Sequence, residues 1–197
     1  MATKQTNREH DFTLVLAGIP DLTEDVENAL FEAGCGDGTI SFRSGRIFVT
    51  FSRQAASLKD AVISAIGDVQ KANIGADIIR VDPCTLVTQS DIARRIQRSR
   101  QMVHQYITGR RGPGNFPPPA CEISETAPLW YWCEVARWLW ENDMIQEEVL
   151  REAEDLAAIN GVLEMRWLKQ LAPDVMEEVV NFFRETDCPT CRQPALV

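Results

Sequence analysis

The side chains best suited to chemistry lie between Thr88 and Gly109, where arginine, glutamine and histidine recur on the polar side of helical patterns. Such side chains donate hydrogen bonds to phosphates and to the edges of bases in a major groove. The residues predicted to contact bases are Arg100, Gln101, His104 and Gln105. The residues predicted to contact phosphates are Arg94, Arg95, Arg98, Ser99, Arg110 and Arg111. The pattern indicates non-covalent recognition of double-stranded DNA.

Charge is concentrated in the same window. The chain has 197 residues and a formal net charge of −9, which by itself argues against a nucleic-acid partner. From Thr88 to Arg111, however, six arginines accompany one acid, Asp91, so this window carries +5 and the remainder −14. A basic segment in an acidic protein is the electrostatic footprint expected of a nucleic-acid interface. The alternative interpretation is a solvated helix face that binds nothing.

Two short helices joined by a turn would present these side chains. In the first helix, Thr88 or Ser90 can act as the N-cap, and the apolar positions at helical spacing are Ile92, Ala93 and Ile96. The apolar face of the second helix consists of Met102, Val103, Tyr106 and Ile107. The second helix is the predicted recognition helix.

The residues after this helix pair predict a wing and a return to the core. Residues 109–114 form a glycine and proline turn that includes two arginines, and residues 115–119 must be extended. Residues 129–132 alternate partly like a strand, and 134–140 resume helical spacing. Four tryptophans are predicted to lie in the core, with stacking on bases as the alternative: Trp130, Trp132, Trp138 and Trp140.

The succession SDIARRI, SRQMVHQYITGRRGPGNFPPP, PLWYW and CEVARWLW resembles the winged helix-turn-helix of phage excisionase and AlpA-type regulators, relatives of the MerR DNA-binding domain. The likeness covers Leu86 to Trp140, where the matching residues are Phe116-Pro117, Trp130 or Trp132, Glu134-Val135 and Trp138-Leu139. Gln97 departs from the pattern, because the turn often has glycine there. The whole chain is also similar to actinobacterial helix-turn-helix proteins with a small α/β domain in front.

The N-terminal part predicts an independent α/β unit. Its expected elements are a strand over 11–16, a helix over 23–33, strands over 39–43 and 46–51 around Ser44-Gly45, a helix over 58–71 and a strand over 77–81. This order is the split βαβ pattern of ferredoxin-like domains. His10 precedes the first strand and is assigned no function. The unit is predicted to serve as a dimerisation module, a small-molecule effector sensor or a surface for a protein partner.

The C-terminal part is acidic and helical by its spacing. Over residues 141–187, Val149, Leu156 and Leu163 lie seven apart, which suits contact with a second subunit or packing on the same chain. Gly161 is a candidate kink, and Pro173 suits the first turn of a final helix. A tail follows at 188–197 with a Cys-Pro-Thr-Cys motif, for which a mobile tail is favoured over a zinc site.

Several function classes are disfavoured. No run approaches the ~18 to 20 uninterrupted apolar residues of a membrane span, so the protein is predicted to be cytoplasmic, with its six cysteines reduced. The Gly34, Gly36 and Gly38 cluster lacks the Lys-Ser/Thr pair of a phosphate loop. Paired carboxylates and a Cys-His arrangement are also missing from the N-terminal part, so we expect neither an enzyme nor a cofactor or metal.

The predicted fold class is α+β: a ferredoxin-like βαββαβ domain over 9–82, a central winged helix-turn-helix over 84–140 and C-terminal helices over 141–187. The predicted function is a sequence-specific, double-stranded DNA-binding transcriptional regulator, a repressor that acts as a homodimer. The alternative is an antitoxin-like or phage-derived module whose acidic helices or ferredoxin-like domain bind a protein partner.

Overall fold

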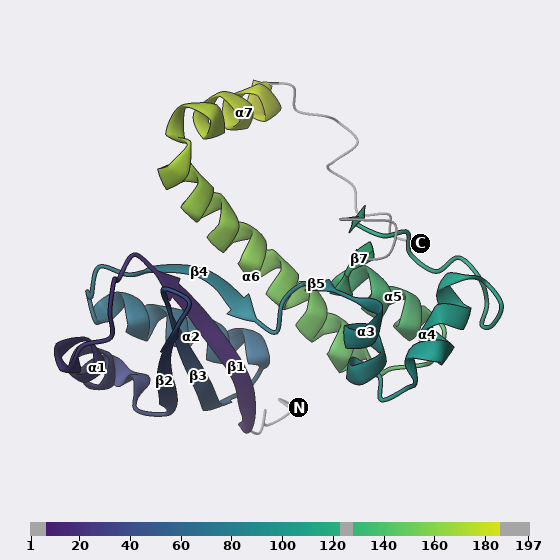
Figure 1. Ribbon diagram of the computed structural model, residues 1–197, viewed down its shortest axis with the longest axis horizontal. Coiled ribbons are helices and arrows are strands. Elements are labelled where there is room, and N and C mark those ends of the chain that lie inside the picture. The colour runs from purple at the N-terminus through teal and green to yellow at the C-terminus, as the bar shows by residue number, and fades with distance from the viewer. Residues whose placement is uncertain (1–6, 123–127, 186–197) are drawn as a thin grey trace, which may run out of the picture.

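The computed structural model describes residues 7–122 and 128–185 and has a mixed α+β architecture (Figure 1). The first seven elements are β1 (Arg8–Ala17), α1 (Glu24–Leu30), the wider helical turn η1 (Phe31–Cys35), β2 (Gly38–Arg43), β3 (Arg46–Ala55), α2 (Leu58–Lys71) and β4 (Asp77–Asp82). Their four strands form an antiparallel sheet in the order β2-β3-β1-β4. Apolar residues at alternate positions of β1 and β3 pack against the helices in one buried core.

Local sequence signals explain most of these boundaries. Thr23 caps α1 and Ser57 caps α2, each through a side-chain oxygen that accepts from a backbone N–H of the first turn. Ser44 and Gly45 have φ angles of 51° and 71° and close the β2–β3 hairpin, as predicted. The predicted start of the first strand was wrong, because β1 begins at Arg8. His10 is therefore a buried strand residue, paired in register with Arg53.

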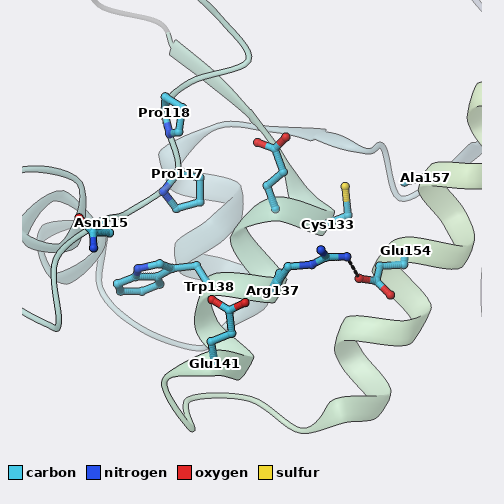
Figure 2. Close-up of a pocket in the computed structure, with 10 residues that line it drawn as sticks. Asn115, Pro117, Pro118, Cys133, Arg137, Trp138, Glu141, Glu154 and Ala157 are labelled. Atoms are coloured by element: carbon cyan, nitrogen blue, oxygen red, sulfur yellow. Dashed lines mark hydrogen bonds and ion pairs between the residues drawn. The ribbon is translucent and has the colours of Figure 1, made fainter. Parts of the chain in front are cut away.

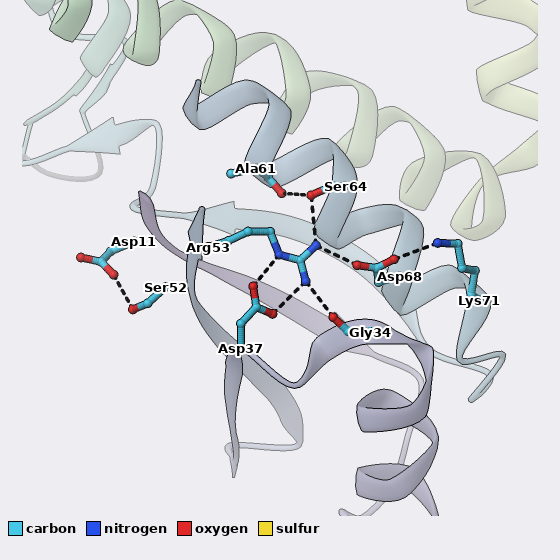
Figure 3. Close-up of polar contacts among 9 residues, drawn as sticks. All are labelled: Asp11, Gly34, Asp37, Ser52, Arg53, Ala61, Ser64, Asp68 and Lys71. Carbon is cyan, nitrogen blue, oxygen red and sulfur yellow. Dashed lines mark hydrogen bonds and ion pairs between the residues drawn. The ribbon is translucent and has the colours of Figure 1, made fainter. Parts of the chain in front are cut away.

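A buried arginine joins the sheet to its helices (Figure 3). The Arg53 guanidinium donates to both carboxylate oxygens of Asp37 at 2.8 and 2.9 Å and to Asp68 Oδ2 at 2.8 Å. It also donates to Ser64 Oγ and to the Gly34 carbonyl oxygen, each at 3.0 Å. These five contacts match the five N–H groups of a guanidinium. The network therefore ties β3 to the loop before β2 and to α2.

Asp68 gives this network a pH dependence. Burial alone would raise the pKa of its carboxyl, but hydrogen bonds from Lys71 and Arg53 hold that pKa below its ordinary value. Because the pKa of this carboxyl is lower in the folded than in the unfolded chain, Asp68 stabilises the fold at pH values above the unfolded pKa of about 3.9. This stabilisation is lost as the pH falls through the folded pKa. We expect Asp68→Asn to lower the free energy of unfolding by about 2 kcal/mol at pH 7.

The difference between Asp68→Asn and the wild type should begin to shrink as the pH falls below the unfolded pKa of about 3.9, and it should vanish once the pH is below the lowered pKa of the folded carboxyl. Urea unfolding at pH 7, 4 and 3 measures this, with the exposed Glu32→Gln as the matched control. A difference that stayed constant from pH 7 to pH 3 would contradict the assignment.

The second unit contains β5 (Leu86–Val87), α3 (Gln89–Arg95), α4 (Arg100–Ile107), β6 (Cys121–Glu122), β7 (Pro128–Tyr131) and α5 (Trp132–Glu141). Its three short strands form an antiparallel sheet in the order β5-β7-β6. Trp130, Trp132 and Trp138 are buried in its core, as predicted. Trp140 differs, since it is 42% exposed. Trp138 Nε1 donates to the Gly114 carbonyl oxygen at 2.9 Å, which fixes the loop after α4.

Helix α6 (Glu147–Leu171) joins the two units, and α7 (Pro173–Glu185) follows it. Leu150 and Ala153 of α6 belong to the tryptophan-containing core, while Leu156 and Leu163 belong to the core of the four-stranded sheet. Packing on the same chain therefore accounts for Leu156 and Leu163. The helix runs through Gly161 without a break, so the candidate kink there was wrong. Among the described residues, no helix is long and apolar enough to cross a membrane.

The free edge of the four-stranded sheet is covered by the same helix. Asn160 accepts from the Val81 backbone N–H at 2.6 Å and donates to the Val81 carbonyl oxygen at 2.9 Å. These two bonds occupy backbone groups that an edge strand would otherwise leave unpaired. Together with the short connection from Asp82 to Leu86, they hold the two units against each other.

Candidate nucleic-acid interface

A capped helix, a tight turn and a second capped helix form the centre of the candidate interface. Thr88 Oγ1 accepts from the Asp91 N–H at 3.2 Å, and the Asp91 carboxylate accepts from the Thr88 N–H at 3.0 Å, which makes a capping box for α3. The hydroxyl and backbone hydrogen bonds from Thr88 hold the pKa of Asp91 below its ordinary value. Of the two predicted caps, Thr88 is the one used.

Gln97 makes the turn between the helices. Its φ of 53° lies in the left-handed region, which the structure accepts from a non-glycine residue. The turn is closed by a hydrogen bond from the Arg98 N–H to the Ala93 carbonyl oxygen at 2.9 Å. Gln97 thus replaces the glycine that is frequent at this position, and the turn keeps its left-handed backbone conformation.

The predicted base-contacting side chains all belong to α4. Arg100, Gln101 and His104 are exposed, and Gln105 is half-buried. Val103 and Tyr106 point the other way and are buried in the core, where Tyr106 packs against Trp138 with ring centroids 5.5 Å apart. The helix therefore presents a polar surface while its apolar face anchors it.

The predicted phosphate-contacting residues fall into two groups, of which the first is accessible. Arg94, Arg98, Arg110 and Arg111 are exposed. Arg94 forms an ion pair with Asp91 at 2.6 Å, and its side chain is 77% exposed. An ion pair this exposed contributes little to stability, so Arg94 can exchange Asp91 for another anion at low cost.

Ser99 and Arg95 form the second group, because both side chains act within the chain. Ser99 caps α4 and accepts from the Met102 N–H at 3.2 Å. The Arg95 guanidinium donates to the Cys84 carbonyl oxygen at 2.8 Å and lies 4.9 Å from the ring centre of Trp132. Burial lowers the pKa of this guanidinium. Arg95 therefore ties α3 to the segment that connects the two units.

The loop between α4 and β6 holds the two remaining arginines. Gly112 has a φ of 85°, and a Cβ atom there would lie 3.1 Å from the Tyr106 ring, so this position favours glycine. The residues predicted to form the wing, 109–119, make turns and an extended stretch with no strand of their own. The antiparallel pair β6–β7 comes directly afterwards.

A groove of about 680 Å³ lies beside this loop, between α5 and α6 (Figure 2). Its walls include Pro117, Pro118 and Trp138, and Arg137 is paired there with Glu154 at 2.5 Å. Glu134, Glu141 and Glu154 contribute three carboxylates against one arginine. Such a surface repels phosphate, so this groove lies outside the candidate interface.

Arg95 and Arg53 have internal roles that were not predicted from the sequence. For Arg53 a signal was available: it continues the inward alternation of Ile47, Val49 and Phe51, where a charged side chain needs buried partners. No group of three or more candidate metal ligands occurs among residues 7–122 and 128–185. The CxxC motif at 188–191 lies outside the described residues.

Comparisons of the chain with known protein families, with curated proteins and with solved structures found no match.

Proposed function

We propose that this protein is a sequence-specific, double-stranded DNA-binding transcriptional regulator that represses as a homodimer. In this proposal residues 84–140 are a winged helix-turn-helix and residues 9–82 a ferredoxin-like domain. The observation that carries it is α4, whose exposed side is built from Arg100, Gln101 and His104 in the one strongly basic segment of an acidic chain. A helix of this kind fits the width of a major groove.

The strand arrangements support both domain assignments. In the second unit a strand, β5, precedes the helix pair α3 and α4, and two strands, β6 and β7, follow it. The strand order is β5-β7-β6, so the chain returns after the helix pair and β7 pairs with β5. This arrangement is the one expected of a winged helix-turn-helix. The order β2-β3-β1-β4, with every neighbouring pair antiparallel, is the arrangement expected of the split βαβ pattern.

The side chains divide into two roles. Arg100, Gln101, His104 and Gln105 are proposed to contact base edges from the recognition helix. Arg94, Arg98, Arg110 and Arg111 are proposed to contact the phosphates on either side. Arg95 and Ser99 support the helix pair from within, through the contacts to Cys84 and Met102. Two copies would place their recognition helices in successive major grooves, about 34 Å apart.

The double variant Arg110→Ala/Arg111→Ala tests the phosphate contacts. Each lost phosphate contact removes the release of about one counterion, so the slope of log Kd against log salt should fall by about 2 in magnitude. Affinity should fall similarly for every duplex sequence, because phosphates carry no base identity. Fluorescence anisotropy titrations between 50 and 300 mM salt measure both quantities.

Arg151→Ala is the matched control, since this exposed arginine lies on α6 and pairs with Glu147. It should leave the slope unchanged. A double variant that kept the wild-type slope would remove Arg110 and Arg111 from the interface.

A further inference from the structure

A cavity of about 290 Å³ lies where the four-stranded sheet meets α6 and the segment that connects the two units. Strands β3 and β4 contribute Arg46, Ile79 and Arg80 to its walls, α6 contributes Trp167, and residues 84–86 line it as well. In Figure 1 this connecting segment runs from β4 to β5 and passes beside α6. The volume is close to the lower limit of ~300 Å³ for small-molecule pockets, so the space suits a small metabolite.

Arg46 is a half-buried cation, and its side chain forms no hydrogen bond or ion pair with any residue in 7–122 or 128–185. Its Nη1 atom is buried. Arg80, the other arginine of the cavity, is already paired, since it donates to both carboxylate oxygens of Asp82 at 2.9 and 3.2 Å. Arginine is seldom buried without a partner, and an unpaired buried donor calls for a bound group. The unpaired guanidinium therefore indicates an anionic ligand.

The other walls of the cavity indicate the rest of that ligand. Trp167, Ile79 and Leu86 are half-buried and offer a ring and two aliphatic side chains to an apolar body. Glu164 also lines the cavity, and its carboxylate disfavours a second negative charge on the ligand. One unpaired guanidinium suits one carboxylate, which it can bind through two parallel hydrogen bonds. These walls favour an organic monocarboxylate over inorganic phosphate.

We infer that this cavity is a binding site for a small organic acid, with the carboxylate held by Arg46 and the apolar body packed against Trp167. The inference goes beyond the proposed function and does not depend on DNA binding. It gives the N-terminal unit the sensor role, one of the three roles expected of that unit from the sequence.

The cavity lies at the junction of the two units. The Cys84 carbonyl oxygen accepts from Arg95 of α3 at 2.8 Å, and the Thr85 carbonyl oxygen accepts from the Trp132 N–H of α5 at 2.7 Å. The segment that lines the cavity is thus bonded directly to α3 and α5. A ligand in this cavity contacts the connection between the sheet and the helix pair.

The experiment compares matched ligands on the full chain without DNA. Saturation-transfer NMR identifies binders among aromatic and branched aliphatic monocarboxylates, and isothermal titration calorimetry gives their dissociation constants. We expect at least one acid to bind with a Kd below about 1 mM. Its carboxamide should bind about tenfold more weakly or worse, because the charge-assisted hydrogen bonds are lost. Acetate, which has the charge without the apolar body, should also bind about tenfold more weakly or worse.

Variants of the cavity locate the site. Arg46→Met should raise the Kd of the acid by about tenfold or more, because it removes the only unpaired cation of the cavity among the described residues. Arg46→Lys should give an intermediate Kd, since lysine keeps the charge without the planar pair of donors. Trp167→Ala should raise the Kd by about tenfold, and Trp167→Phe should keep it within about threefold of the wild type.

Arg43→Met is the matched control. Arg43 is exposed, pairs in register with Arg46 at the β2–β3 hairpin and lies over the Phe48 ring, 4.0 Å from its centre. Its removal should leave the Kd within about twofold of the wild type. Circular dichroism of every variant keeps loss of folding separate from loss of binding.

The inference would be overturned if no acid of the set bound the wild type below about 1 mM, or if the carboxamide bound as tightly as the acid. A folded Arg46→Met variant with the wild-type Kd would also overturn it.

Discussion

Replacing Arg53 with methionine is expected to lower the free energy of unfolding by about 3 to 5 kcal/mol. The side chain of Arg53 is 9% exposed, and its removal leaves Asp37, Asp68 and the Gly34 carbonyl oxygen without their shared donor. Methionine fills a similar volume, so the loss comes from uncompensated carboxylates more than from a cavity. Urea unfolding followed by circular dichroism at pH 7 measures the change.

Arg46→Met is the matched control for Arg53→Met. Arg46 lies on the same strand and is half-buried, and its Nη1 atom is buried without a hydrogen-bond partner. Removing this guanidinium leaves no carboxylate among the described residues without a partner. The free energy of unfolding should therefore change by about 1 kcal/mol or less. Equal effects of the two substitutions would contradict the structural role given to the Arg53 network.

Trp130→Ala should have the second large effect, a loss of about 3 to 5 kcal/mol in the stability of the unit that includes α3 and α4. Trp130 is 2% exposed, and its Nε1 donates to the Pro117 carbonyl oxygen at 3.1 Å. Its ring also meets that of Phe116 edge-on, with centroids 6.3 Å apart. Thermal unfolding monitored by tryptophan fluorescence measures the loss.

Trp140→Ala is the control for Trp130→Ala, because Trp140 belongs to the same tryptophan-rich stretch and is 42% exposed. The expected change is below about 1 kcal/mol. If Trp140→Ala left stability intact and yet abolished DNA binding, Trp140 would join the interface as a stacking residue. A Trp130→Ala variant with unchanged stability and unchanged DNA binding would contradict the prediction that the tryptophan-containing core supports α3 and α4.

Local signals in the sequence predicted much of the fold. Ser57 and the apolar spacing after it fixed α2 at its observed bounds, and Ser44-Gly45 fixed the hairpin register, because caps and tight turns depend on neighbouring residues. The start of β1 was missed, because Arg8 and His10 are strand residues through pairing with β3, more than 40 residues away.

Long-range contacts limited what could be predicted about the candidate site. The side chains on α4 followed from helical spacing alone, and their exposure agrees with that spacing. The internal role of Arg95 depends on Cys84 and Trp132, which only the folded chain brings to it. The same holds for Asn160, whose bonds to Val81 span 79 positions along the chain.

The most direct test of DNA recognition is a selection of bound duplexes from a randomised library by the full chain, with Arg100→Ala, Gln101→Ala and the control Arg151→Ala beside it. We expect the wild type and the control to enrich an inverted repeat whose half-sites lie about 10 base pairs apart. Arg100→Ala and Gln101→Ala should each lose preference at one position per half-site, at a cost of about 1 to 3 kcal/mol. A wild-type chain that enriched no sequence, or α4 variants that enriched the wild-type sequence unchanged, would contradict recognition by α4.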